Sequence, residues 1–261
     1  MVKLQLSKFL GKGILDLLLF LIRKPQKQAL KLAWLILQVK PTYTMVSTKR
    51  LINLYPLVRE ANALSLPGDI VECGVWNGGS AAIMGMACLD DQNRNPMRNL
   101  WLFDSFRGLP PPGERDEKRA RDSYFEGWCK GDVEKVVKIF HRLGVPLENV
   151  KIIEGWFDSK LAATDIKAIA LLHIDVDWYE SVKVVLEKLY DRVVEEGFIV
   201  LDDYWTWSGC QAAVEDYLRE KRIEGVVMKS VDRHGTYFQK PLQKRGCTSP
   251  GACHAPRPIH S

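Results

Sequence analysis

Short apolar runs alternate with amphipathic segments along most of the chain between Met45 and Lys240. Continuous apolar runs of this length indicate strands buried on both faces, as in a parallel sheet covered by helices. The segments between them repeat their apolar residues with helical spacing. We expect strands at 69–74, 100–104 and 150–154 and within the runs 168–177 and 197–203, and helices at 47–66, 80–90, 132–143 and 181–195.

This alternation predicts a doubly wound, Rossmann-like α/β sheet that is mostly parallel. Near the C-terminal end, 226–231 and 236–240 flank a polar turn, which predicts an antiparallel hairpin. The charged segment 110–126 is interpreted as a long mobile connection. The chain therefore divides into an N-terminal helical extension (1–40), one α/β domain (41–240) and a flexible tail (241–261).

The charge of the chain is concentrated at its N-terminal end. The net charge is +5, yet residues 1–40 contain eight Lys or Arg residues and a single acid, Asp16. That segment carries +7, so the remainder carries −2, which argues against a nucleic-acid-binding domain. Six cysteines without disulfide spacing indicate a reduced, cytoplasmic protein. Cys247, Cys253 and His254 fall in the tail and are more typical of an unstructured segment than of a metal site.

The N-terminal extension contains two apolar stretches, 14–22 and 30–39. The first is shorter than a bilayer span and includes Asp16, and no signal-peptide cleavage site follows it. We favour two helices that pack on the domain or on a partner subunit in a homo-oligomer. The alternative is a basic amphipathic anchor that makes peripheral contact with an anionic membrane.

Two acidic clusters follow apolar runs, Asp175 with Asp177 and Asp202 with Asp203. Open α/β sheets bind ligands at the carboxyl ends of their strands, where these acids would lie. Four carboxylates in one place repel each other unless a divalent cation joins them. The pattern predicts a metal-assisted active site.

The turns after the first three expected strands indicate a second ligand. Gly74, Gly78 and Gly79 follow Glu72 and permit close approach of a ligand at a helix N-terminus. An acid such as Asp104 after the second strand commonly binds ribose hydroxyls. Trp156 and Phe157 could flank a purine. A nucleoside cofactor with positive charge, S-adenosylmethionine, fits these turns better than NAD or ATP.

Four segments, 72–80, 103–110, 173–181 and 201–204, resemble the macrocin O-methyltransferase family (TylF type) in the same order along the chain. The resemblance covers roughly residues 41–240. It implies a class I methyltransferase fold and Mg²⁺-dependent transfer of a methyl group from S-adenosylmethionine to a hydroxyl acceptor, typically on a sugar of a small molecule or glycan. Antibiotic sugars, polysaccharides and glycolipids all remain open as acceptors.

The resemblance also implies roles for individual residues. The metal ligands are Asp175, Asp202 and Asp203; Asp175 and Asp177 are catalytic, with Asp177 as the general base or a substrate-orienting acid. The implied cofactor-binding residues are Thr44, Met45, Glu72, Gly74, Gly78, Ser80, Asp104, Ser105, Trp156 and Phe157.

Further residues lie close to these positions in the sequence. His173 shares a strand face with the acids and is interpreted as a partner of a metal ligand. Tyr204, Trp205 and Trp207 either line the acceptor pocket or serve as packing residues. Two other functions use the same residues: a metal-dependent hydrolase or nucleotidyl enzyme, and a non-catalytic scaffold at a membrane surface.

Overall fold

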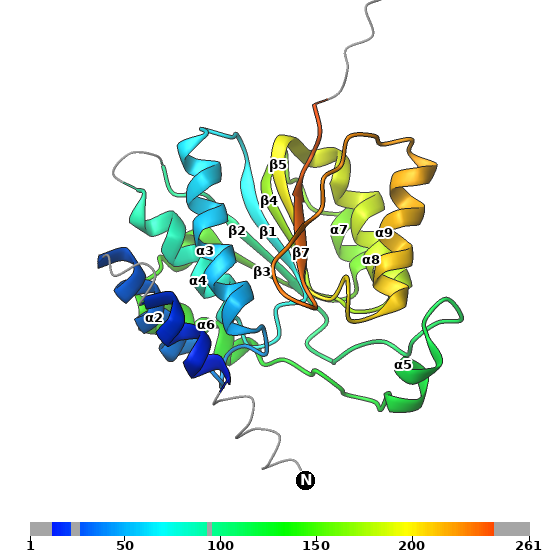
Figure 1. Ribbon diagram of the computed structural model, residues 1–261, viewed down its shortest axis with the longest axis horizontal. Coiled ribbons are helices and arrows are strands. Elements are labelled where there is room, and N and C mark those ends of the chain that lie inside the picture. Colours follow the sequence, from blue (N-terminus) through cyan, green and yellow to red (C-terminus); the bar gives the residue numbers. More distant parts are fainter. Residues whose placement is uncertain (1–11, 22–26, 93–95, 243–261) are drawn as a thin grey trace, which may run out of the picture.

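The computed structural model describes residues 12–21, 27–92 and 96–242, and its centre is one seven-stranded sheet (Figure 1). The strand order is β3-β2-β1-β4-β5-β7-β6. The first five strands are parallel, and β7 pairs antiparallel with both β5 and β6. The strands are β1 (Asp69–Cys73), β2 (Leu100–Asp104), β3 (Val150–Glu154), β4 (Ile169–Ile174), β5 (Val193–Leu201), β6 (Lys229–Ser230) and β7 (Thr236–Gln239). This is the predicted doubly wound sheet with its C-terminal hairpin.

Helices cover both faces of the sheet (Figure 1). One face carries α2 (Lys27–Val39), α3 (Thr48–Ala63), α4 (Gly79–Asp90) and α6 (Val133–Leu143). The other carries α7 (Phe157–Ala162), α8 (Tyr179–Leu189) and α9 (Ser208–Glu220). Side chains alternate across each strand, so Ile70 of β1 packs in the first core and Val71 in the second.

Local sequence signals set several helix ends. Helix α3 begins after Ser47, whose hydroxyl accepts the N–H of Arg50 at 3.2 Å. Helix α6 begins after Asp132, which accepts the N–H of Glu134 at 2.9 Å, and ends at the left-handed Gly144. Side-chain acceptors satisfy free N–H groups at a helix start, and glycine adopts the left-handed end without a steric penalty.

Three expectations for the elements were wrong or incomplete. The helix expected over 181–195 ends at Leu189, and a 3₁₀ turn leads into β5 at Val193, which pairs with Ile169 of β4. The segment 110–126 is not a featureless connection, because it contains helix α5 (Lys118–Ser123) and the buried Asp116. Helices α7 and α9 were not expected, and β6 is shorter than 226–231.

The N-terminal extension is described in part. Residues 12–21 form a helix, and Leu17 packs in the first core together with Leu35, Ile36 and Val39 of α2. Within the described ranges, no helix combines the length and apolarity needed to cross a bilayer. Cys247, Cys253, His254 and nearly all of the expected tail lie outside the described residues.

Candidate active site

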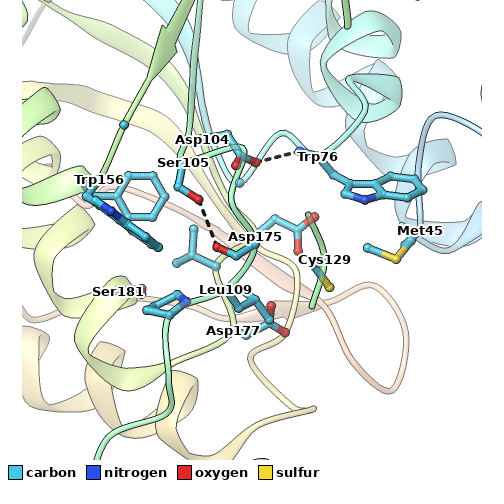
Figure 2. A pocket seen from close by; sticks show the side chains of 16 residues that line it. Met45, Trp76, Asp104, Ser105, Leu109, Cys129, Trp156, Asp175, Asp177 and Ser181 are labelled. Carbon is cyan, nitrogen blue, oxygen red and sulfur yellow. Dashed lines mark hydrogen bonds between the residues drawn. The ribbon is translucent and has the colours of Figure 1, made fainter. Parts of the chain in front are cut away.

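A pocket opens at the carboxyl ends of β1, β2, β3 and β4, and the turns after these strands contribute side chains to its walls (Figure 2). In Figure 2, Trp156 and Met45 lie on opposite sides of the pocket, with Asp175 and Asp177 between them. Of the predicted residues, it is lined by Met45, Gly74, Asp104, Ser105, Trp156, Phe157, Asp175 and Asp177. The other lining residues carried no individual prediction, although Trp76 lies in the predicted cofactor turn and Pro110 begins the connection 110–126: Trp76, Gly108, Leu109, Pro110, Cys129, Gly155, Val176 and Ser181.

The turn between β1 and α4 forms the floor of the pocket. Gly74 has φ +88°, and a Cβ atom there would lie 1.9 Å from the carbonyl oxygen of Asp175. Only glycine allows β1 and the β4 end to approach this closely. Gly78 also has a left-handed conformation, but it packs against Val136 and does not line the pocket. Ser80 is buried in α4 and likewise lies outside the pocket lining.

Asp104 joins two turns of the pocket through its carboxylate. One oxygen accepts the N–H groups of Trp76 (Figure 2) and Val75, both at 2.8 Å, and the other accepts the N–H of Phe106 at 2.7 Å. Burial raises the pKa of Asp104, and these three N–H groups oppose the rise. The carboxylate therefore orders the β1 and β2 turns. Ser105 donates to the carbonyl oxygen of Gly108 at 3.0 Å.

The segment before α3 covers one side of the pocket. The N–H of Gly79 donates to the Tyr43 carbonyl at 2.7 Å, and the Asn77 amide donates to the Thr42 carbonyl at 3.0 Å. These bonds hold the segment against the start of α4. Thr44 is buried and accepts the N–H of Val46, whereas Met45 extends into the pocket (Figure 2).

Glu72 lies beneath the site and not in the pocket lining. Its carboxylate is fully buried and accepts from Nδ1 of His173 at 2.8 Å across the β1–β4 register. The other ring nitrogen, Nε2, lies 3.8 Å from Oδ1 of Asp202. Within the described part of the chain, Glu72 Oε2, His173 Nε2 and Asp202 Oδ1 are buried without a hydrogen-bond partner. Glu72 and His173 therefore form a buried polar row that ends at Asp202 of the acidic cluster.

The four acids of the two clusters share one electrostatic environment. The pKa values of Asp175 and Asp177 are raised well above the ordinary value by burial and by repulsion from the neighbouring carboxylates. Burial and the charge of Asp202 raise the pKa of Asp203 to about 6. Asp202 differs, since Arg50 and His173 outweigh its burial and lower its pKa. Mutual repulsion therefore disfavours ionisation of all four carboxylates together unless a cation joins them.

The donor set fits a divalent cation. His173, Asp175 and Asp202 each offer one ligand atom, and these atoms lie within 4.8 Å of one another. The carboxylates of Asp175 and Asp202 are the oxygen ligands that Mg²⁺ prefers, and the unpartnered Oδ1 of Asp202 is available to an ion. Asp203 is not in this group of three but is close enough to affect the pKa of Asp175.

Arg50 was not predicted as a site residue. Its guanidinium donates to both the carboxylate Oδ2 and the main-chain carbonyl of Asp202, and Nε lies 3.5 Å from Asp232 in the β6–β7 turn. Arg50 therefore supplies one positive charge to the cluster. No local pattern marks this residue, because the two acids that it binds lie more than 150 positions away in the chain.

Asp177 is held by an aromatic cluster. It adopts a left-handed backbone conformation with φ +57°, and its Oδ1 accepts the indole N–H of Trp207 at 2.7 Å. Trp207 packs edge-on against Trp178 and Trp128. The aromatic residues after β5 were expected to line the acceptor pocket or to serve as packing residues, and neither role describes all three. Trp207 binds an acid of the pocket. Tyr204 packs in the second core, and Trp205 lies half-exposed beside it.

Comparisons with known proteins agree with this geometry. Residues 33–240 match the macrocin O-methyltransferase (TylF) family. The chain is 33% identical over 202 residues to demethyldecarbamoylnovobiocin O-methyltransferase of Streptomyces niveus, covering 76% of each chain. It is 30% identical over 203 residues to mycinamicin III 3''-O-methyltransferase of Micromonospora griseorubida, covering 76% of this chain and 78% of the relative.

Two solved structures share the fold. The O-methyltransferase NovP superimposes with a TM-score of 0.70 at 32% identity, over 77% of this chain and 83% of NovP. The calicheamicin methyltransferase CalS11 superimposes with a TM-score of 0.60 at 18% identity over 88% of this chain and 91% of CalS11, which supports the fold alone. The family match decides against the hydrolase and the non-catalytic scaffold. This chain belongs to the macrocin O-methyltransferase family and is an O-methyltransferase with a class I methyltransferase fold.

Proposed function

We propose that this enzyme transfers a methyl group from S-adenosylmethionine to a sugar hydroxyl of a glycosylated small molecule or glycan, with Mg²⁺ at the acidic cluster. One observation carries the proposal: Asp175 and Asp177 project into the same pocket as Met45, Asp104 and Trp156 (Figure 2). The acids and the positions that we expect to bind the nucleoside thus share one cavity. A relative that is 35% identical over 200 residues is a 4'-O-methyltransferase of a dimethoxyrhamnosyl tetracenomycin from Streptomyces olivaceus, which supports a sugar acceptor.

The cofactor would occupy the part of the pocket between the β1 turn and Trp156. Gly74 provides close backbone approach, Asp104 and Ser105 lie where a ribose binds in this fold, and Trp156 with Phe157 offers an aromatic wall for adenine. S-adenosylmethionine supplies a methyl group on a positively charged sulfur. A cationic ligand at this place would stabilise the ionised form of the clustered carboxylates, which burial and mutual repulsion disfavour.

The metal would be held by Asp175, Asp202 and Asp203. Bound there, Mg²⁺ supplies a Lewis acid that lowers the pKa of a coordinated sugar hydroxyl. Glu72 and His173 support this site from beneath, because His173 is fixed by Glu72 and faces Oδ1 of Asp202. Glu72 acts through His173 in this arrangement, rather than by direct contact with the cofactor.

Asp177 would accept the proton of the acceptor hydroxyl. Its raised pKa makes the carboxylate a stronger base than an ordinary aspartate, and the indole of Trp207 fixes one oxygen of this pocket-lining side chain. The aromatic cluster of Trp128, Trp178 and Trp207 excludes water from this side of the pocket. The segment 108–131, which contributes Leu109, Pro110 and Cys129, would contact the acceptor.

Calorimetric titration with S-adenosylmethionine, followed by a methyl-transfer screen over glycosylated acceptors, tests the proposal. The enzyme should bind the cofactor, and Trp156→Ala should weaken binding about fivefold through loss of about 1 kcal/mol of aromatic contact. Trp205→Ala is the matched control, because Trp205 is exposed to a similar degree and lies outside the pocket lining. Equal affinities in the two variants would contradict the placement of adenine, and absence of cofactor binding would contradict the proposed reaction.

A further inference from the structure

The two N-terminal helices have an apolar outer face in addition to the inner face that packs on the domain. On α2, Leu30, Trp34 and Leu37 recur at helical spacing and are each at least half exposed, whereas Leu32 and Ile36 are buried. On the helix over 12–21, Ile14, Leu15, Leu18 and Leu19 are between 42% and 55% exposed. We call these seven residues the outer apolar face. Monomeric soluble proteins seldom expose so many large apolar side chains on adjacent helices.

The charges around this face are positive. Lys12 and Lys27 are exposed at its edges, whereas Lys31, which follows Leu30 on α2, forms an ion pair with Asp90 of α4. The short segment between the two helices contains Arg23 and Lys24. The acid of this region, Asp16, lies 3.6 Å from Lys49 and so is compensated by a residue of α3. The net charge of +7 over residues 1–40 is therefore not balanced within the extension.

We propose that the helices over 12–21 and 27–39 dock this enzyme on an anionic membrane surface, with the outer apolar face among the lipid acyl chains and the basic residues at the headgroups. Leucine and tryptophan on one face with lysine and arginine beside them are the composition of helices that lie in the membrane interface. Each basic residue near anionic lipid adds about 1 kcal/mol. A second copy of the chain fits less well, since an interface with two-fold symmetry would place one +7 segment beside another.

Docking would also orient the pocket. Met45 lines the pocket and follows the end of α2 at Val39 by six residues, which span at most about 20 Å. Met45 therefore lies within about 20 Å of the C-terminal end of α2. If the proposed function holds, an acceptor sugar attached to a membrane lipid would reach the pocket without leaving the membrane.

Vesicle flotation of the full chain tests the docking. The enzyme should float with vesicles of phosphatidylcholine and phosphatidylglycerol, and at least about tenfold less with phosphatidylcholine alone or at high salt. The combined variant Leu15→Gln, Leu18→Gln, Trp34→Gln and Leu37→Gln should lose at least about tenfold in binding while its circular dichroism stays unchanged. The control replaces the exposed Leu147 and Val227 with Gln, elsewhere on the surface, and should bind like the wild type.

Three results would overturn the inference: no flotation of the wild type with anionic vesicles, equal flotation of the two variants, or a wild-type dimer in light scattering that the face variant converts to a monomer. The last result would assign the face to a second copy of the chain. Methyl transfer to a water-soluble glycoside is measured in parallel and should be the same in wild type and face variant. Flotation tests the docking, and methyl transfer to the soluble glycoside tests the proposed function. Either result can be negative without affecting the other.

Discussion

Arg50 of α3 and Asp202 at the end of β5 form an ion pair in which the guanidinium binds both the side chain and the main-chain carbonyl of the aspartate. The two side chains are only 11% and 5% exposed. The pair joins α3, which follows the segment that covers one side of the pocket, to the acids that would bind the metal. It also leaves Oδ1 of Asp202 without a partner among the described residues. Arg50 thus neutralises part of the cluster while one oxygen stays available to an ion.

Replacing Arg50 should make the thermal stability of the protein more dependent on Mg²⁺. In EDTA, Arg50→Met should lower the free energy of unfolding by about 3 kcal/mol, because Asp202 loses its partner in a buried site. Addition of Mg²⁺ should then raise the melting temperature of Arg50→Met by more than it raises that of the wild type. Differential scanning calorimetry with EDTA and with Mg²⁺ measures both shifts.

Arg59→Met is the matched control for Arg50→Met. Arg59 lies on the same helix and binds Asp91 at 3.0 Å, away from the acidic cluster. Its loss should destabilise the protein without changing the Mg²⁺ shift. An Arg50→Met shift equal to or smaller than that of the wild type would show that Arg50 does not compensate the charge of the metal site.

We expect the rate of methyl transfer to depend on Asp177 and on the hydrogen bond that Asp177 accepts from Trp207. Asp177→Asn should lower kcat by about 10²-fold to 10⁴-fold. Trp207→Phe keeps an aromatic ring and removes the indole N–H that fixes Asp177, so kcat should fall about tenfold with the KM for S-adenosylmethionine unchanged. Steady-state kinetics measures both, with Trp205→Phe as control. Wild-type kcat in Trp207→Phe would show that the hydrogen bond does not orient the base.

Substitutions at Gly74 and Gly144 distinguish the cost of a steric clash from the cost of a left-handed backbone conformation. Both have positive φ, but a Cβ at Gly144 meets nothing within 4 Å, whereas at Gly74 it would overlap the Asp175 carbonyl. Gly144→Ala should cost about 1 kcal/mol of left-handed strain. Gly74→Ala should cost at least about 2 kcal/mol more. Urea unfolding measures the difference, and equal losses would contradict the close contact between the β1 turn and β4.

The hydrogen bond between Tyr179 of α8 and Asp216 of α9 predicts that the free energy of unfolding depends on pH. Tyr179 donates to Asp216 at 2.9 Å and Arg115 donates at 2.6 Å, and these bonds lower the pKa of Asp216 to about 2. Because the folded-state pKa lies below the unfolded value, the stabilisation is fully present above about pH 4 and is lost as the pH falls through about 2.

Asp216→Asn isolates this contribution. The difference in unfolding free energy between wild type and Asp216→Asn should be constant from pH 7 to about pH 5 and should shrink below about pH 4. Urea denaturation at a series of pH values measures it. A difference that stays constant down to pH 3 would show that Asp216 is not stabilised by its partners in the ionised form.

The sequence predicted those features that depend on neighbouring residues. The strands β2 and β3 and the capped start of α6 follow from apolar runs and from Asp132, and they agree with the structure residue by residue. Helix α7, with only six residues, is too short to show a periodic pattern. Helix α9 does space Cys210, Ala213, Val214 and Tyr217 on one buried face, so its signal was present and overlooked.

Contacts between distant parts of the chain were not predictable in the same way. The order in 110–126 depends on Asp116, whose carboxylate accepts the N–H of Tyr179 at the start of α8, 63 positions away. The Arg50–Asp202 and Trp207–Asp177 pairs likewise join separate elements. Apolar periodicity places elements in a fold, but it does not determine which polar side chains meet across it.

Methyl transfer with and without Mg²⁺ tests the central claim most directly. A glycosylated acceptor is incubated with S-adenosylmethionine, and mass spectrometry detects the gain of one methyl group by the wild type and by Asp202→Ala. The account predicts methylation by the wild type in Mg²⁺, loss of methylation in EDTA and in Asp202→Ala, and nearly unchanged binding of S-adenosylmethionine by the variant in calorimetry. Equal methylation in EDTA, or by Asp202→Ala, would contradict a metal-assisted O-methyltransferase.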